Sequence, residues 1–316
     1  MIPRPKRFAR AVRYPLIRAA LGLAAFLPRA AIAPLGKLLG ALGYALLGGE
    51  RRKALGSLAV AFPELSANEH RDMAHAMFMH LAHSALELAI VRKLDRDLEA
   101  YVELPVESAA IYRAALARGK GAVFVTAHLG NWELLARRLA RTGLPCATIA
   151  KEMVDPRLTA LVDRIRARGG LRTLWRGAPG AAKAMLRTLK QGGALGLLID
   201  QDTKVQGVFV EFFGRPAFTP RAAADLVLRT GAAALVGFIH RKPGGGHRME
   251  ISELEAPNGR NEAAVVELTA RFTREIERAI RAHPGEWVWL HQRWKTRPTG
   301  NPELASATAQ LSSSMR

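Results

Sequence analysis

The sequence contains little cysteine, and its first 49 residues contain no acidic residue. Cys146 is the only cysteine among 316 residues, so neither an intramolecular disulfide nor a cysteine metal cluster can form. It lies in the apolar run "PCATIA", which is typical of a buried thiol. The first acidic residue is Glu50, whereas eight lysines and arginines precede it. A redox function is therefore not expected, and the amino-terminal segment is basic throughout.

Long uninterrupted hydrophobic runs are also missing from residues 1–49. Pro28, Arg29, Pro34 and Lys37 interrupt this segment, so no charge-free run reaches the roughly 18 residues of a simple spanning helix. A secretory signal is disfavoured because no small-residue cleavage site follows a short apolar core. Apolar residues that alternate with basic ones favour an interfacial anchor on anionic lipid, with single-pass insertion left open. The six basic residues of its first half are Arg4, Lys6, Arg7, Arg10, Arg13 and Arg18.

What the chain does contain indicates one large folded domain. Its apolar fraction of 49% and charged fraction of 23% are those of a globular protein. We predict a membrane anchor over 1–49, a catalytic domain over 50–298 and a flexible tail over 299–316. The net charge of +20 indicates anionic partners, such as an acidic protein or an anionic membrane. Nucleic acid is not expected, because Trp287, Trp289 and Trp294 are more typical of a core than of base stacking.

The hydrophobic pattern predicts an α/β fold with a mixed central sheet flanked by helices. Residues 50–117 show helical spacing, and later apolar runs alternate with capped helices. Asp155 with Pro156 and Thr219 with Pro220 are predicted helix starts. Of the helical histidines at 70, 75, 80 and 83, the last three have no Asp or Glu among them as a third ligand, so we predict no metal site there. The predicted strands are "GAVFVTA", "CATIA", "ALGLLI", "AAALVGFI" and "HRMEIS".

Polar residues follow three of the predicted strands, in "AHLGNWE" (127–133), "AK" (150–151) and "IDQD" (199–202). Ligands bind at such strand ends in α/β sheets. His128 follows its strand directly, and Glu133 falls in the first turn of the next helix, where the dipole favours a carboxylate. If the turn folds back, Glu133 can accept one ring proton and leave the other nitrogen of His128 as a base. The spacing thus permits a His–Glu dyad.

Other catalytic motifs do not accompany this pair. There is no Gly-x-Ser-x-Gly sequence or reactive cysteine to form an acyl-enzyme, and no His-Glu-x-x-His sequence for zinc. The base would instead deprotonate a substrate hydroxyl that attacks an activated carbonyl directly. We therefore expect neither a metal nor a cofactor.

Longer stretches carry a resemblance to a known family. "AHLGNWE", "IDQDTKVQGVFVEFFGRPAFTP" and "HPGEWVWLHQRWKTRP" occur in the order and spacing of the bacterial lipid A biosynthesis acyltransferases. The sequence resembles these late acyltransferases, of lauroyl and myristoyl type, over about residues 50–298. The resemblance implies a fold like that of glycerolipid acyltransferases. It also implies that the protein is an enzyme, an acyltransferase that transfers groups other than aminoacyl groups.

The resemblance also implies roles and partners. His128 would be the general base and Glu133 would orient it. The donor would be an acyl carrier protein thioester, and the acceptor an anionic glycolipid at the cytoplasmic face of the inner membrane. Further residues implied in substrate binding are Lys151, Arg176, Asp200, Asp202 and Arg293, the last in a cluster with Lys295 and Arg297.

One departure from the family pattern concerns the acceptor. Lys151 stands where the family more often has arginine, and lysine lacks the bidentate fork of a guanidinium. Another membrane lipid, such as an aminolipid or another glycolipid, therefore stays open as the acceptor. A non-catalytic, basic membrane-binding scaffold is the alternative from a different functional class. Separately, we expect Phe212 and Phe213 in the core or along an acyl channel.

Overall fold

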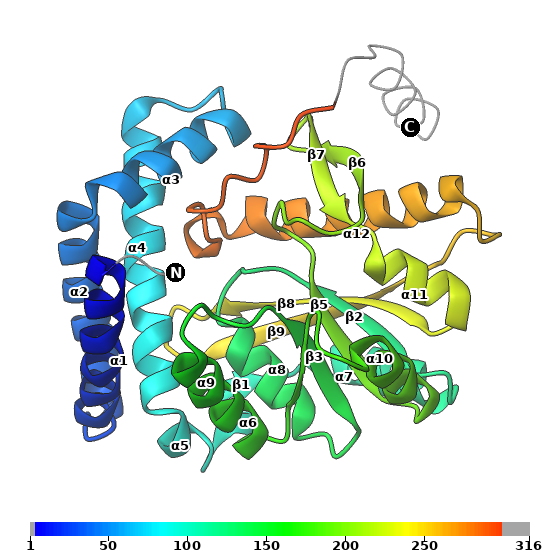
Figure 1. Ribbon diagram of the computed structural model, residues 1–316, viewed down its shortest axis with the longest axis horizontal. Helices are drawn as coiled ribbons and strands as arrows, with labels where there is room; N and C mark the ends of the chain where they lie inside the picture. The colour runs from blue at the N-terminus through cyan, green and yellow to red at the C-terminus, as the bar shows by residue number, and fades with distance from the viewer. Residues whose placement is uncertain (1–3, 299–316) are drawn as a thin grey trace.

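The fold is a central β-sheet with helices on both faces (Figure 1). The computed structural model describes residues 4–298, so the predicted tail over 299–316 lies outside the described residues. Within this range a seven-stranded sheet has the order β1-β9-β8-β2-β5-β3-β4. Its strands are Val102–Glu103 (β1), Ala122–Thr126 (β2), Cys146–Ala150 (β3), Arg172–Trp175 (β4), Ala194–Leu198 (β5), Ala233–Arg241 (β8) and His247–Leu254 (β9).

Neighbouring strands in this sheet are parallel except for the antiparallel pair β8 and β9. The predicted α/β class with a mixed sheet is thereby confirmed. The tight segment "KPGGGHR" connects β8 to β9, as its glycines indicate. The carboxyl ends of β2, β3 and β5 lie at one edge of the sheet, which brings the three predicted polar strand ends together.

A separate hairpin of β6 (Gly207–Phe212) and β7 (Arg215–Pro220) was not predicted. The prediction that Thr219 and Pro220 begin a helix is wrong. Thr219 pairs with Val208 in the hairpin, and the next helix begins at Ala222. A threonine before proline suits an extended strand end as well as a helix start, because the residue before proline favours extended backbone.

Two apolar layers cover the sheet because strand side chains alternate between its faces. Val123 and Val125 of β2 belong to the core beneath α10, α11 and α12, whereas Ala122 and Phe124 face α7 and α8. Figure 1 shows α11 and α12 on one side of the sheet and α7 and α8 on the other. These helices, with α9, are Val106–Ala117 (α7), Trp132–Ala140 (α8), Pro156–Arg168 (α9), Ala181–Lys190 (α10), Ala222–Thr230 (α11) and Glu262–Ala282 (α12).

The amino-terminal helices pack at one end of the sheet. A Cβ at Gly40 of α2 would lie 2.3 Å from the Cα of Met79 in α4, so glycine permits this close helix contact. No single helix among the described residues is long and apolar enough to cross a membrane, and Arg29–Leu46 with Gly48–Ala61 qualifies only as a pair bent by 92°. The elements here are Arg4–Ala24 (α1), Arg29–Ala31 (η1), Ile32–Leu46 (α2), Gly48–Ala61 (α3), Ala67–Ala89 (α4), Val91–Leu94 (α5) and Leu98–Tyr101 (α6).

The carboxyl-terminal aromatic residues lie in the core, as expected. Trp287 and Trp289 are fully buried and meet edge to face, with ring centroids 4.6 Å apart. Phe212 packs against Trp287 and Trp294, and Phe213 is also buried. This aromatic cluster ties the segment after η2 (Pro284–Glu286) to the β6–β7 hairpin.

Candidate active site

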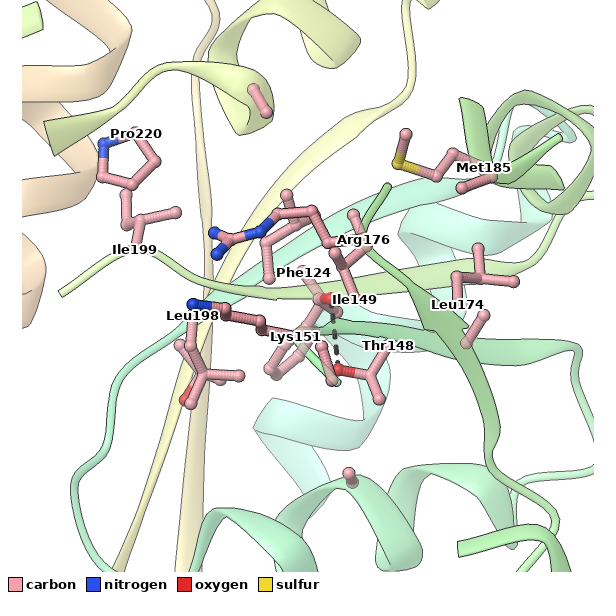
Figure 2. Close-up of a pocket in the computed structure, with 18 of the residues that line it drawn as sticks. Phe124, Thr148, Ile149, Lys151, Leu174, Arg176, Met185, Leu198, Ile199 and Pro220 are labelled. Atoms are coloured by element: carbon pink, nitrogen blue, oxygen red, sulfur yellow. Dashed lines mark hydrogen bonds between the residues drawn. The ribbon is translucent and has the colours of Figure 1, made fainter. Parts of the chain in front are cut away.

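A cavity of about 740 Å³ opens at the carboxyl edge of the sheet. The ladder between β3 and β5 ends at the pair Thr148 and Gly196, although both strands continue beyond it. The sheet therefore separates there, and residues from both of its faces line the cavity (Figure 2). The larger apolar side chains of its wall include Phe124, Leu135, Leu139, Leu174, Met185 and Leu198.

His128 lies at the lip of this cavity, in the loop after β2, with a side chain that is 22% exposed. Its Nδ1 lies 2.9 Å from Oδ1 of Asp200, which lies two residues after the end of β5. An ionised carboxylate only accepts hydrogen bonds, so Nδ1 carries the proton. The other ring nitrogen, Nε2, is then unprotonated and can act as a base.

Asp200 is held by three hydrogen bonds in a dry environment. Its side chain accepts from the backbone N–H of His128 and from Nε1 of Trp287, each at 2.8 Å, besides the imidazole. Burial alone would raise the pKa of Asp200. The charge of His128 and the hydrogen bonds from His128 and Trp287 outweigh burial and hold the pKa below its ordinary value. Asp200 is therefore an anion at neutral pH.

Gln201 and His291 complete the surroundings of the imidazole. The Gln201 Nε2 atom lies 3.1 Å from each ring nitrogen of His128 and 2.7 Å from Nε2 of His291. An amide nitrogen that is equally close to both ring nitrogens cannot lie along both of their lone pairs. Burial, with the charge of His128, lowers the pKa of His291 to about 4, so His291 is neutral and accepts from Gln201.

The hydrogen bond predicted between Glu133 and His128 is not present in the structure. Glu133 accepts instead from Arg166 of α9, at 2.6 Å from Nη2 and 3.0 Å from Nε. Asp200 takes the place at the imidazole that local spacing assigned to Glu133. Glu133 and Arg166 nevertheless line the same cavity as His128. Glu133 thus lies close to the base without orienting it, and its part in catalysis stays a prediction.

Two predicted binding residues, Lys151 and Arg176, stand at the mouth of the cavity. They follow the neighbouring parallel strands β3 and β4, and the backbone N–H of Arg176 donates to the carbonyl of Ala150 at 2.8 Å. Figure 2 shows both side chains extending to the same side of the cavity. Within residues 4–298 neither forms an ion pair, so two positive charges are available to an anionic ligand.

Asp202 and Arg293, also predicted to bind substrate, do not line the cavity. Asp202 accepts from the backbone N–H and hydroxyl of Thr296, at 2.8 and 3.0 Å. Arg293 is 1% exposed and donates to the carbonyl of Phe218 at 2.6 Å and to Thr219. Burial lowers its pKa to about 10. Both residues join chain segments near the site, and their contact with substrate stays a prediction.

The loop that carries His128 is fixed from several sides. The carbonyl of His128 accepts from the N–H of Val288, and the N–H of Gly130 donates to the carbonyl of Glu286, both at 3.1 Å. Gly130 has φ +61°, and a Cβ there would lie 1.8 Å from the carbonyl oxygen of Ile239. Asn131 caps α8 by accepting from the N–H of Leu134. Only glycine fits at position 130, and the hydrogen bonds of His128, Gly130 and Asn131 hold the turn from strand to helix in place.

A buried polar cluster supports this loop from α4. Glu87 is fully buried and accepts from Asn131, Arg241 and His247 at 2.8 to 2.9 Å. Burial alone would raise the pKa of Glu87, but the hydrogen bonds and charges of His247 and Arg241 lower it strongly. Two of the helical histidines, at positions 80 and 83, also lie beside this cluster, where burial lowers both pKa values to about 4.

Several site residues were missed by the sequence analysis. Gln201 and His291 lie within motifs that were noted, but only their charged neighbours were chosen. Arg166 had no sequence signal, since nothing local shows that α9 turns it toward Glu133. Cys146 lines the cavity, where burial raises its pKa to about 12, so it is a neutral thiol and not a nucleophile.

Fold and site together define a class: α/β proteins that hold a histidine–carboxylate pair over an apolar cavity at the edge of a mostly parallel sheet. The family model of the bacterial lipid A biosynthesis acyltransferases matches residues 5–296. The chain therefore belongs to this family, which confirms the resemblance found in the sequence.

Individual relatives act on different lipids according to their names. The lipid A biosynthesis lauroyltransferase of Escherichia coli (strain K12) is 28% identical over 290 residues, which are 89% of this chain and 91% of that protein. The palmitoleoyltransferase of the same strain is 28% identical over 291 residues, 88% of this chain and 89% of that protein. The phosphatidylinositol mannoside acyltransferase of Mycobacterium tuberculosis (strain CDC 1551 / Oshkosh) is 28% identical over 190 residues, and the match spans only 57% of each protein.

Glu286, which helps to hold the loop that carries His128, is expected to make the stability of the protein depend on pH. Burial raises the pKa of Glu286 to about 7, and its carboxyl group accepts from the N–H of Arg241. Between about pH 4.5 and 7 the folded protein holds a proton that the unfolded chain has lost, so stability falls as pH rises through 7. We expect Glu286→Gln to remove about 2 kcal/mol of this fall in the free energy of unfolding between pH 5.5 and 8.

Urea unfolding of wild type and Glu286→Gln at pH 5.5 and 8 measures the effect. Glu64→Gln is the matched control, because Glu64 is exposed and should leave the pH dependence of wild type unchanged. The same fall with pH in Glu286→Gln as in wild type would contradict the assignment.

Proposed function

We propose that the protein is a membrane-associated O-acyltransferase. It moves a fatty acyl chain from an acyl carrier protein thioester to a hydroxyl of a lipid A precursor, at the cytoplasmic face of the inner membrane. The observation that carries this proposal is the imidazole of His128, paired through Nδ1 with the buried carboxylate of Asp200 at the lip of an apolar cavity.

The proposed reaction needs one base and no covalent enzyme intermediate. Nε2 of His128 removes the proton from the acceptor hydroxyl as its oxygen attacks the thioester carbonyl carbon. The C–O bond forms, the C–S bond breaks, and the imidazolium returns its proton to the departing thiolate. Asp200 keeps the proton on Nδ1 and stabilises the positive ring that forms transiently. The products are an ester and a free thiol.

The chemistry of the cavity suits a fatty acyl chain. Its wall is mainly apolar beyond the histidine, so a hydrocarbon chain entering it leaves water and gains hydrophobic stabilisation. A hydrocarbon chain that fills this space displaces water from it, which limits hydrolysis of the thioester. Glu133 and Arg166 lie at the polar end of this wall. We assign them to holding the acceptor, with Glu133 retained as a candidate catalytic residue.

The charged mouth of the cavity suits an anionic headgroup. Lys151 and Arg176 present two cations that have no acidic partner within residues 4–298, and a phosphate of a glycolipid would satisfy both. Because Lys151 supplies a single point charge, the second, bidentate contact falls to Arg176. The net charge of +20 also favours an acidic donor protein, because opposite charges speed encounter.

The surface of α1 and α2 suits a membrane. It exposes an unusual number of large apolar side chains for a protein in water. Arg18 and Lys37 on the same helices form no ion pair within the described chain and can meet anionic lipid headgroups. The exposed apolar residues are Leu16, Leu23, Phe26, Leu38, Leu39, Leu42, Leu46 and Leu47.

A second acceptor is favoured by the relatives. Three of them are named phosphatidylinositol mannoside acyltransferases, so related chains act on a glycolipid other than lipid A. The same histidine-catalysed transfer to such a lipid is the alternative function. A non-catalytic scaffold is disfavoured by the paired imidazole, because His128 lines a substrate-sized cavity.

Substitutions in the histidine–carboxylate pair test the mechanism. His128→Ala should lower kcat about 10²–10⁴-fold, the usual contribution of a general base. Asp200→Asn should lower kcat by a similar factor, because an amide can donate to Nδ1 and thereby reverse the tautomer of the ring. Transfer of a labelled acyl group to lipid in detergent micelles, measured over a range of pH, gives both kcat and its pH profile.

Glu133→Gln is the matched control for Asp200→Asn, because both replace a carboxylate by an amide. We expect Glu133→Gln to weaken acceptor binding and to leave the acidic limb of the pH profile unchanged. If Glu133→Gln abolishes transfer while Asp200→Asn retains it, the original His–Glu dyad is correct and the His–Asp pair is not.

The acceptor is identified by lipid mass spectrometry of a strain that lacks the gene. Loss of secondary acyl chains from lipid A, restored by the wild-type gene but not by His128→Ala, is the expected result. Intact lipid A together with an underacylated second glycolipid would support the alternative acceptor. An unchanged lipid profile together with no transfer from acyl carrier protein in vitro would favour the scaffold.

A further inference from the structure

Gly196 lies in the middle of β5, where its own backbone does not require glycine. Its φ is outside the left-handed region, since it is not among the glycines with positive φ. A Cβ built on it would meet the carbonyl of Ala147 and the hydroxyl of Thr148 at 3.6 Å, an ordinary van der Waals distance. By contrast, a Cβ at Gly237 in β8 would lie 2.3 Å from the Phe124 ring. Packing explains Gly237 but not Gly196.

Glycine inside a strand weakens it, and often marks a place where a ligand comes close to the backbone. The missing side chain of Gly196 would point toward the cavity. Its register partners Phe124 and Thr148 share its face of the sheet, as do Ala194 and Leu198 of its own strand. All five residues line the cavity, and across it on this face stand the α8 residues Leu135 and Leu139.

The position of Gly196 along the cavity is intermediate. Leu198 lies one side-chain repeat, about 7 Å, nearer the edge that carries His128, and Ala194 lies one repeat farther from it. Cys146 pairs with Ala194 and lines the same far part. Gly196 is also the last residue of β5 that pairs with β3, so it stands where the two strands separate. A side chain there would narrow the cavity about halfway along.

We propose that Gly196 determines the length of acyl chain that the enzyme accepts. This inference rests on the proposed acyl transfer and adds a specificity-determining residue to it. Without a side chain at position 196, a hydrocarbon chain that begins beside His128 passes over β5 into the space walled by Leu139, Cys146 and Ala194. A side chain there closes this far space and leaves the near part, beside Leu198, open to shorter chains.

The test measures competition between donors of different length. Purified wild type, Gly196→Ala and Gly196→Val each receive a mixture of acyl carrier proteins that carry saturated chains from 8 to about 18 carbons, with lipid products resolved by mass spectrometry. The ratio of long-chain to short-chain product should fall about tenfold or more in Gly196→Val, and less in Gly196→Ala. The kcat/KM for the shortest accepted chain should stay within about twofold of wild type.

Gly56→Ala provides the matched control, since Gly56 is exposed on α3 and its Cβ would contact nothing within 4 Å. This control should keep the wild-type length profile, and melting temperatures confirm that each variant folds. If the larger valine impairs folding, Gly196→Ala alone tests the inference, because the Cβ of alanine fits the space at position 196.

Two results would overturn the inference while the proposed function stands. One is an unchanged length profile in a folded Gly196→Val enzyme, and the other is an equal loss of activity for all chain lengths. A wild-type enzyme that transfers no chain of any length to lipid would instead overturn the proposed function itself, and the inference with it.

Discussion

The hydrogen bond between Nδ1 of His128 and the carboxylate of Asp200 is the interaction on which the site depends. It selects the ring tautomer, fixes the ring plane and leaves Nε2 as the unprotonated nitrogen of a ring that lines the cavity. Asp200 can do this only as an anion, although it is fully buried, and a buried carboxylate is stable only when its oxygens accept strong hydrogen bonds. The backbone of His128 and the indole of Trp287 supply two of them.

Several other parts of the structure hold the two residues of this hydrogen bond in place. Trp287 follows η2 and belongs to the aromatic cluster that packs on the β6–β7 hairpin, so the carboxyl-terminal segment reaches Asp200 through the core. On the other side, Glu87 of α4 holds Asn131, and Glu286 holds Gly130. These anchors hold the loop from both sides, which aligns the base before any substrate arrives.

The sequence predicted the main elements because their signals are local. Apolar runs predicted the central strands near their observed bounds, and Asp155 with Pro156 predicted the start of α9. The partner of His128 was not local: Asp200 is 72 residues away, and only the parallel pairing of β2 with β5 brings it to the ring. Glu133 had the right spacing, but Arg166 from another helix takes its carboxylate. The role of Gly196 depends on where β3 and β5 separate, which no residue pattern shows.

The state of the His128 ring tests the account most directly. Nitrogen-15 NMR of the histidine side chains, with the His128 signal assigned from its loss in His128→Gln, shows which ring nitrogen carries the proton. At a pH where the ring is neutral, we predict a proton on Nδ1 that is shifted far downfield by the Asp200 carboxylate, and an unprotonated Nε2. A proton on Nε2 with a bare Nδ1 would contradict the account, because the nitrogen facing the substrate could not then act as the base.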